Sequence, residues 1–210
     1  MKLNAEGFEI EEGLDMHYQV LKELGDCYAA LNRHSDARRC YLEAAELAPE
    51  EAAPRVGLGV LALQQGQLDS AVDSFNHARR INSACSEAYG GLAMVCQQRR
   101  DYPRAFDLYL KCLELNSDNL IALLGLFQAS CQMGTFGKII QFLELYLDRH
   151  PGDTSVLFCL ATLYAREGKL AQAHQSLLTV LALEPDKVEA QRLLDEVERK
   201  LGPRLARSRQ

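Results

Sequence analysis

A leucine recurs every 34 residues along most of the chain, and this regular spacing limits the folds that the sequence can adopt. The leucines are Leu24, Leu58, Leu92, Leu126, Leu160 and Leu194. A second series in the same register is Ala37, Ala71, Ala105, Ile139 and Ala173, and a third is Tyr41, Phe75, Tyr109, Leu143 and Leu177. Self-similarity at a fixed period of about 20–50 residues indicates stacked copies of one small structural unit. We therefore expect an array of repeats.

Within one unit, two stretches repeat their apolar residues with the spacing of a helix. Leu58 and Ala62 lie about one helical turn apart in the first stretch, and Ala71 and Phe75 do so in the second. Gly66 lies between them, where the end of a helix requires a residue in the left-handed conformation. Each unit is therefore predicted to be a pair of antiparallel helices. The pairs must stack, because one pair cannot bury both of its apolar faces.

The order of residue types in each unit resembles the tetratricopeptide repeat family. A leucine and a small residue are followed by an alanine, an aromatic residue and a closing proline or serine; in the second unit these are Leu58, Gly59, Ala71, Phe75 and Ser83. The resemblance implies an all-α fold, a right-handed superhelical solenoid of antiparallel helix pairs.

The same register predicts how the chain is divided. We expect an acidic N-terminal leader at 1–17 and five repeats at 18–51, 52–85, 86–119, 120–153 and 154–187. A C-terminal capping helix is expected at 188–201, in which Asp195 and Glu198 replace core positions with polar residues. Gly202 and Pro203 should end this helix, and a basic tail follows at 202–210.

The fourth repeat departs from the pattern at three positions. Phe127, Ile139 and Tyr146 stand where the other repeats mostly have small residues that let the two helices touch. Larger side chains at a helix contact force the helices apart. We therefore expect the fourth helix pair to be splayed or shifted.

The overall composition excludes several classes of protein. The formal charge of −6 argues against a broad nucleic-acid surface, since such binding depends on clustered lysine and arginine. The longest apolar run, residues 120–127, is well below the ~20 residues that span a bilayer. Residues 1–12 lack the apolar stretch of a secretory signal. We expect a cytoplasmic protein with no membrane span.

No motif in the chain predicts catalysis or a cofactor. Phosphate loops, dinucleotide fingerprints and metalloprotease motifs are absent, and the five histidines fall at unrelated repeat positions. The seven cysteines are odd in number and lack zinc-site spacing, so we expect reduced thiols. Cys131 and Cys159 map to adjacent inner faces, and a redox or metal role for that pair is the alternative. We expect no enzyme, and no catalytic, cofactor or metal residues.

The family resemblance implies that the first helix of each repeat lines a concave surface where partner segments lie. Its positions are apolar in the middle of the array, and the predicted partner-binding residues are Val56, Gly57, Val60, Gly91, Met94, Ile121, Leu124, Gly125 and Phe158. The basic clamp of heat-shock co-chaperones is represented by Lys22 alone, so that ligand is not expected. The three glycines indicate either close helix packing or room for a ligand backbone.

Two functions follow from this reading. The first is a chaperone-like scaffold or adaptor that binds an apolar or amphipathic peptide or helix in a concave groove. The second is a structural protein that assembles with itself head-to-tail through oppositely charged ends. Residues 1–15 hold five acids against Lys2, whereas residues 199–210 hold five bases and no acid.

Overall fold

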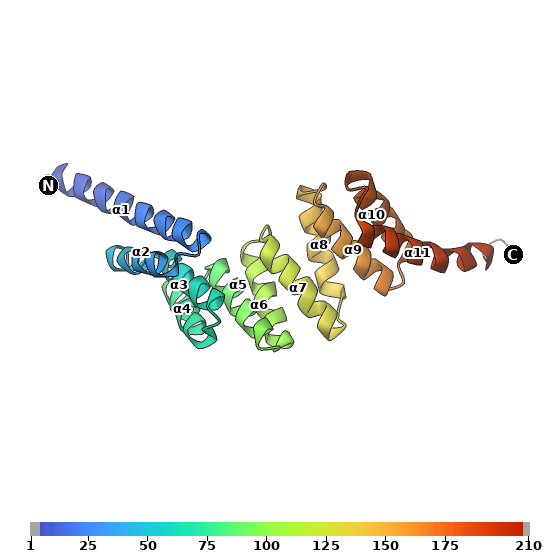
Figure 1. Cartoon of the computed structure of the whole chain (residues 1–210), viewed down its shortest axis with the longest axis horizontal. Coiled ribbons are helices and arrows are strands. Elements are labelled where there is room, and N and C mark those ends of the chain that lie inside the picture. Colours follow the sequence, from blue (N-terminus) through green and yellow to red (C-terminus); the bar gives the residue numbers. More distant parts are fainter. Residues whose placement is uncertain (1–4, 208–210) are drawn as a thin grey trace. The chain divides into compact units, whose positions relative to one another are not determined.

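The computed structural model describes the backbone of residues 5–207 and the side chains of residues 17–202. This part of the chain forms eleven helices and no strand, so the predicted all-α array of helix pairs is confirmed (Figure 1). The helices are α1 (Ala5–Ala30), α2 (His34–Leu47), α3 (Ala53–Gln64), α4 (Leu68–Ile81), α5 (Ser86–Gln98), α6 (Tyr102–Leu115), α7 (Leu120–Met133), α8 (Gly137–Arg149), α9 (Thr154–Arg166), α10 (Leu170–Leu183) and α11 (Val188–Arg207).

The chain divides into two compact units. The first comprises residues 1–116 and contains α1 to α6, and the second comprises residues 117–210 and contains α7 to α11. In the first unit, each odd-numbered helix packs closely on the helix that follows it, and α1, α3 and α5 also touch in sequence. The second unit repeats this arrangement with α9, α10 and α11. The first helices of neighbouring repeats therefore line one common side of the first unit.

The turn inside each repeat contains one residue with a left-handed backbone. These residues are Asn32, Gly66, Arg100, Gly134 and Gly168, with φ between 57° and 75°, and they are 34 residues apart. The left-handed conformation predicted at Gly66 is confirmed. Asn32 and Arg100 adopt it with a Cβ atom present, which costs roughly 1–2 kcal/mol for most residues. Every repeat thus reverses its chain with the same turn.

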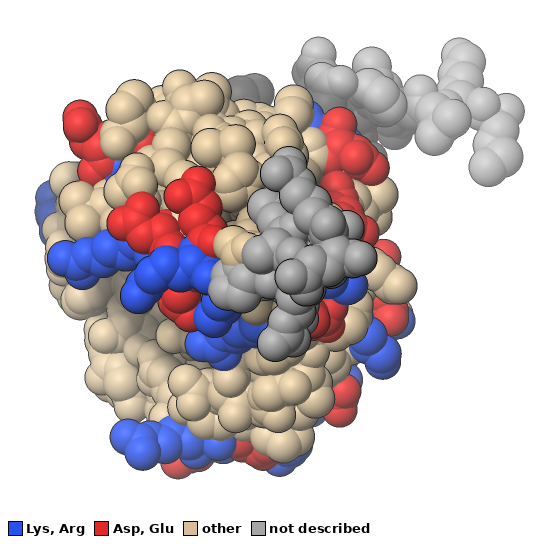
Figure 2. Space-filling model, turned by 90° about the vertical axis from the view of Figure 1, so that its right-hand side faces the viewer, with Lys and Arg blue, Asp and Glu red and all other residues tan. Residues whose placement is uncertain are grey.

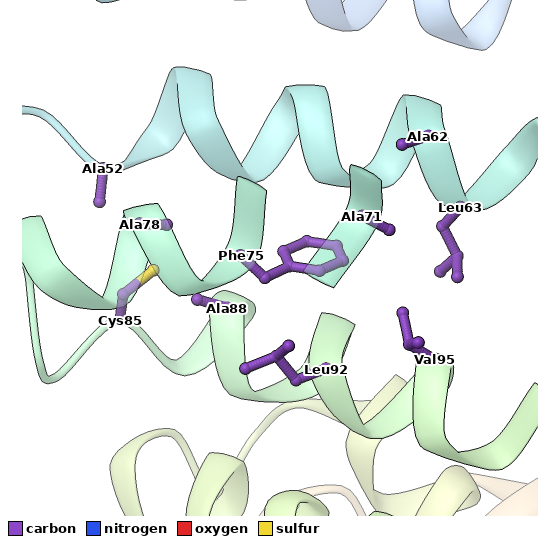
Figure 3. Close-up of a cluster of buried hydrophobic side chains, with 10 residues drawn as sticks. All are labelled: Ala52, Ala62, Leu63, Ala71, Phe75, Ala78, Cys85, Ala88, Leu92 and Val95. Atoms are coloured by element: carbon purple, nitrogen blue, oxygen red, sulfur yellow. The ribbon is translucent and has the colours of Figure 1, made fainter. Parts of the chain in front are cut away.

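An aromatic ring from the second helix of a repeat fills the space between two glycines. Phe75 is completely buried between α3 and α5, as Figure 3 shows. A Cβ atom added at Gly59 would lie 2.6 Å from the ring, and one added at Gly91 would lie 2.3 Å from it. Tyr41 has the same relationship to Gly25 and Gly57. Glycine at these places lets neighbouring repeats pack on a large ring.

The fourth repeat is built differently. Its helices, α7 and α8, are packed much less closely against each other than the helices of every other pair. The predicted splaying of this pair is therefore confirmed. Ile139 and Tyr146 are buried, so their extra volume occupies the space that small residues leave free elsewhere. Leu143 takes the ring position with a smaller side chain, where its flanking positions are Phe127 and Cys159.

At both ends of the described chain, the helices extend beyond the predicted boundaries of the repeats and the capping helix. The leader predicted at residues 1–17 is helical from Ala5 and continues without a break into the first repeat helix. The capping helix does not end at Gly202 and Pro203 but runs on to Arg207. A proline removes only its own backbone donor, and a helix can bend and continue past it. Residues 1–4 and 208–210, predicted as parts of the leader and the tail, lie outside the described residues.

Candidate protein-binding groove

A groove of about 1160 Å³ runs along the side of the first unit that α1, α3 and the start of α5 share. Small and branched apolar side chains form its floor. Val60 is 37% exposed and Val56 is half-buried, with its inner side packed against the core shown in Figure 3. Ala29 and Ala30 of α1 and Ala53 of α3 lie beside them. The floor is therefore apolar and open enough to be contacted by another molecule.

A short polar network fixes the wall that α1 contributes. The Tyr41 hydroxyl donates a hydrogen bond of 2.7 Å to Asp26 Oδ1. Asp26 also forms an ion pair of 2.8 Å with Lys22. Burial, followed by the bond with Asp26, raises the pKa of Tyr41, so the phenol stays neutral and keeps donating. The hydrogen bond with Asp26 raises the pKa of Lys22, so this base stays charged and paired.

Carboxylates form the remainder of the groove's charged lining. Glu50 and Glu51 lie in the turn before α3, and Glu87 lies in the first turn of α5. All three side chains are exposed, and none forms an ion pair with a described residue; Glu87 accepts a 3.5 Å hydrogen bond from Cys85 Sγ. Lys22 is the only basic residue among the described residues that line the groove. The groove therefore carries a net negative charge.

The structure places the predicted binding residues of the first unit in two environments. Val56, Gly57 and Val60 line the groove. Gly91 is buried beneath the ring of Phe75, and Met94 packs against the same core cluster. Of the two explanations for the aligned glycines, close packing accounts for Gly57 and Gly91, because each faces an aromatic ring.

The predicted residues of the second unit differ in how far they are exposed. Ile121 is 67% exposed, whereas Leu124 and Phe158 are half-buried and Gly125 is buried. The Lys187 ammonium lies 5.8 Å from the centre of the Phe158 ring. Ile121 is therefore the residue of this set that offers the most apolar surface to a partner.

The set of partner-binding residues predicted from the sequence leaves out the acidic part of the lining. Glu50 and Glu51 belong to a connecting turn, so positions carried over along the helices do not reach them. Glu87 lies one helical turn before Gly91, but a search for an apolar strip passes over it. The signal available was the cluster of acids in the short segments that precede first helices.

A different face of α3 carries the opposite charge. A cleft of about 250 Å³ between α2 and α4 is lined by His34, Arg38 and Arg55, and by no acidic residue. Its other lining residues are neutral, and the Nδ1 atom of His34 is buried there without a hydrogen-bond partner. The groove and this cleft of the first unit are therefore lined by charges of opposite sign.

The thiols in the described chain are free. Burial raises the pKa of both Cys112 and Cys159 to about 11, and proximity to Cys131 contributes at Cys159. A thiol with so high a pKa is protonated near neutral pH and is a poor nucleophile or metal ligand. Among the side chains that the structure describes, no group of three or more His, Cys, Asp or Glu is arranged to hold a metal. This disfavours the redox or metal role considered for Cys131 and Cys159.

Two further observations concern membranes and the chain ends. No described helix is long and apolar enough to cross a bilayer. The view toward α10 and α11 shows basic and acidic side chains interspersed (Figure 2). Lys200, one of the basic residues expected to join chains, is paired with Glu196 of its own helix. The other charged side chains of that hypothesis lie mainly in residues 1–16 and 203–210, outside the described side chains.

Comparison with known proteins bears on the family. A family model for the tetratricopeptide repeat matches residues 22–84 and again residues 56–119, across the repeats that form the groove. The 34-residue register and the helix pairs continue beyond this range. The chain is a tetratricopeptide-repeat protein. As in the family generally, this architecture is a scaffold for protein interaction.

Three similar proteins, one found by sequence and two by structure, illustrate the range of similar proteins. The human protein O-mannosyl-transferase TMTC1 is 24% identical over 190 residues, which are 87% of this chain but 22% of that protein. The chain thus spans about a fifth of the length of that relative. PilF of Pseudomonas aeruginosa has a TM-score of 0.75 at 18% identity, covering 91% of this chain and 87% of its own. YrrB, described as a TPR protein with an unusual peptide-binding site, has a TM-score of 0.63 at 18% identity, covering 90% and 97%.

Proposed function

We propose that this tetratricopeptide-repeat protein is an adaptor that binds an extended or helical segment of another protein in the groove of its first unit. The observation that carries the proposal is the apolar floor, where Val60 and Val56 stay accessible inside a hollow of about 1160 Å³. A hollow of this size accommodates several residues of a peptide. The peptide-binding site named for YrrB, which shares the fold, supports the same use of the architecture.

The energetics favour a segment over a small molecule. Burying a whole valine contributes ~1.5–3 kcal/mol, and Val60 has only part of its surface left to bury. Association also costs several kcal/mol in lost freedom of movement. A partner must therefore contact many groove residues together. A peptide chain does this, because its side chains can reach the floor while its backbone follows the groove.

The second unit offers further apolar side chains to the same kind of partner. Ile121, Leu124 and Phe158 keep apolar surface accessible there, and Ile121 is the most exposed. We propose that a longer partner also contacts these residues. The two surfaces contribute independently in this proposal, so each has its own test.

The proposal can be tested without knowing the natural partner. Peptides are selected from a random phage-displayed library against the whole protein, and their affinities are then measured for variants. Val60→Ser should weaken the selected peptides about two- to fivefold, because a serine cannot contribute the apolar burial. Leu178→Ser is the matched control, since Leu178 is 42% exposed on α10 and is not among the residues that line the groove.

The outcomes separate the candidate surfaces. Losses with Val60→Ser and unchanged affinity with Leu178→Ser support the groove. If Ile121→Ser alone lowers the affinity for the selected peptides, the binding site lies in the second unit and not in the groove. Unchanged binding in both Val60→Ser and Ile121→Ser, with circular dichroism showing intact helices, would contradict the proposed function.

A further inference from the structure

We infer that the groove of the first unit selects a partner segment rich in lysine and arginine, with apolar residues between the bases. This inference rests on the proposed function and adds the chemistry of the ligand. Its observations are the carboxylates that line the groove and the absence of a free base among the described lining residues.

The balance of charge in the groove is one-sided. Lys22 is the one base in the described lining, and its charge is already paired with that of Asp26. Glu50, Glu51 and Glu87 are left without an ion pair among described residues, and all are solvent-exposed. Charges that line the same hollow add their fields, and a cleft of one sign attracts ligands of the other. A cationic segment can therefore pair with carboxylates that have no competing base beside them.

The positions of these carboxylates also exclude the opposite ligand. The N-termini of α3 and α5 border the groove at Ala53 and Ser86. Helix N-termini carry a partial positive charge and would otherwise attract an anionic group. Here Glu50 and Glu51 precede one terminus, and Glu87 lies within the other. An acidic partner would meet repulsion at both ends where the backbone could have bound it.

The apolar floor determines the other half of the ligand's chemistry. Val56 and Val60 lie on α3, which follows the turn that holds Glu50 and Glu51, and both line the groove. A segment that places bases at the rim must therefore present apolar side chains to the floor. A polybasic chain without apolar residues would leave that surface uncovered, so the preferred ligand mixes the two residue types.

The sequence itself supplies a suitable probe. Residues 199–210 contain five basic residues, no acid, and two leucines, Leu201 and Leu205. A synthetic peptide with this sequence is titrated into the 210-residue chain, and a counterpart peptide carries glutamate at the five basic positions. The basic peptide should bind at least about tenfold more tightly than the acidic one, with an affinity that falls as salt screens the charges.

Two charge-reversal variants give the decisive comparison. The groove variant carries Glu50→Lys, Glu51→Lys and Glu87→Lys. The control variant carries Glu46→Lys, Asp73→Lys and Asp107→Lys, which change the same number of charges at exposed positions of the same unit outside the groove. The groove variant should lose about tenfold or more in affinity for the basic peptide, and the control variant about twofold or less. Thermal melts confirm that both variants fold.

Three results would overturn the inference: no binding of the basic peptide, equal binding of both peptides, or equal losses in the two variants. The library selection separates this failure from failure of the proposed function. The selected peptides could be neutral or acidic and still bind Val60→Ser more weakly. This result would support the groove as the binding site but refute its preference for basic segments. Selected peptides rich in lysine and arginine that weaken in the groove variant alone would support both.

Discussion

The ring of Phe75 lies so close to Gly91 of the next repeat that a Cβ atom at residue 91 would be 2.3 Å from the ring's Cζ atom. The ring is completely buried. Neighbouring repeats in the first unit are therefore held at their spacing by an aromatic ring pressed between two helices. The groove depends on this spacing, because α3 and α5 both contribute to its walls.

This contact predicts opposite effects for two adjacent glycines. Gly91→Ala should destabilise the protein by about 1–3 kcal/mol, because the added methyl group overpacks a rigid site. Gly90→Ala is the control, since its Cβ would lie 3.4 Å from Cys112 Sγ. That substitution should be neutral or stabilising by up to about 1 kcal/mol through helix propensity. Urea unfolding of both variants measures the difference, and equal effects would show that the ring can yield.

The turn between the two helices of a repeat offers a second prediction. Arg100→Gly should stabilise the protein by roughly 1 kcal/mol, because Arg100 has φ of 61° and glycine adopts this conformation without the Cβ penalty. Gly66→Ala should destabilise by a similar amount at the equivalent turn, where φ is 71°. If the melting temperature falls for Arg100→Gly, the Arg100 side chain stabilises the folded protein by more than the backbone strain destabilises it.

The buried thiols predict a decline in stability at alkaline pH. Burial raises the pKa of Cys112 to about 11 in the folded state, against about 8.5 for an unperturbed thiol. Folding thus favours the protonated form, and the unfolded chain loses its proton first as pH rises. The resulting stabilisation is complete below about pH 8.5 and is lost progressively up to about pH 11.

A variant isolates that effect from other groups that titrate in the same range. Urea unfolding at several pH values between 7 and 10 should show a shallower alkaline decline for Cys112→Ala than for the unchanged protein. Cys27→Ala serves as the control, because Cys27 is exposed. If the decline is equally steep in all three proteins, the thiol at residue 112 does not contribute to it.

The sequence predicted the repeat fold well because every repeat carries the same pattern at the same spacing. It also predicted the loosely packed fourth pair, since Ile139 and Tyr146 are visibly too large for their positions. The end of α11 was predicted wrongly, because a glycine and a proline weaken a helix locally without deciding its end. Likewise, only the three-dimensional contacts show that Gly57 and Gly91 face aromatic rings.

The groove was predicted less well than the fold. Val56 and Val60 follow from their register on α3, and both line it. Glu87 also follows from its register on α5, but Glu50 and Glu51 do not, because they lie in a turn whose path depends on how two helices pack. Single-residue patterns describe each helix by itself, whereas a groove depends on side chains from α1, α3 and α5 meeting in space.

Mapping a bound peptide by nuclear magnetic resonance tests the central claim most directly. The 210-residue chain is labelled with ¹⁵N, and a library-selected peptide is titrated while backbone amide shifts are followed. The groove proposal predicts that the largest changes in the first unit cluster at Val56, Gly57, Val60 and Glu87. Changes concentrated instead on the outer helices α2, α4 and α6, with the groove amides unmoved, would contradict it.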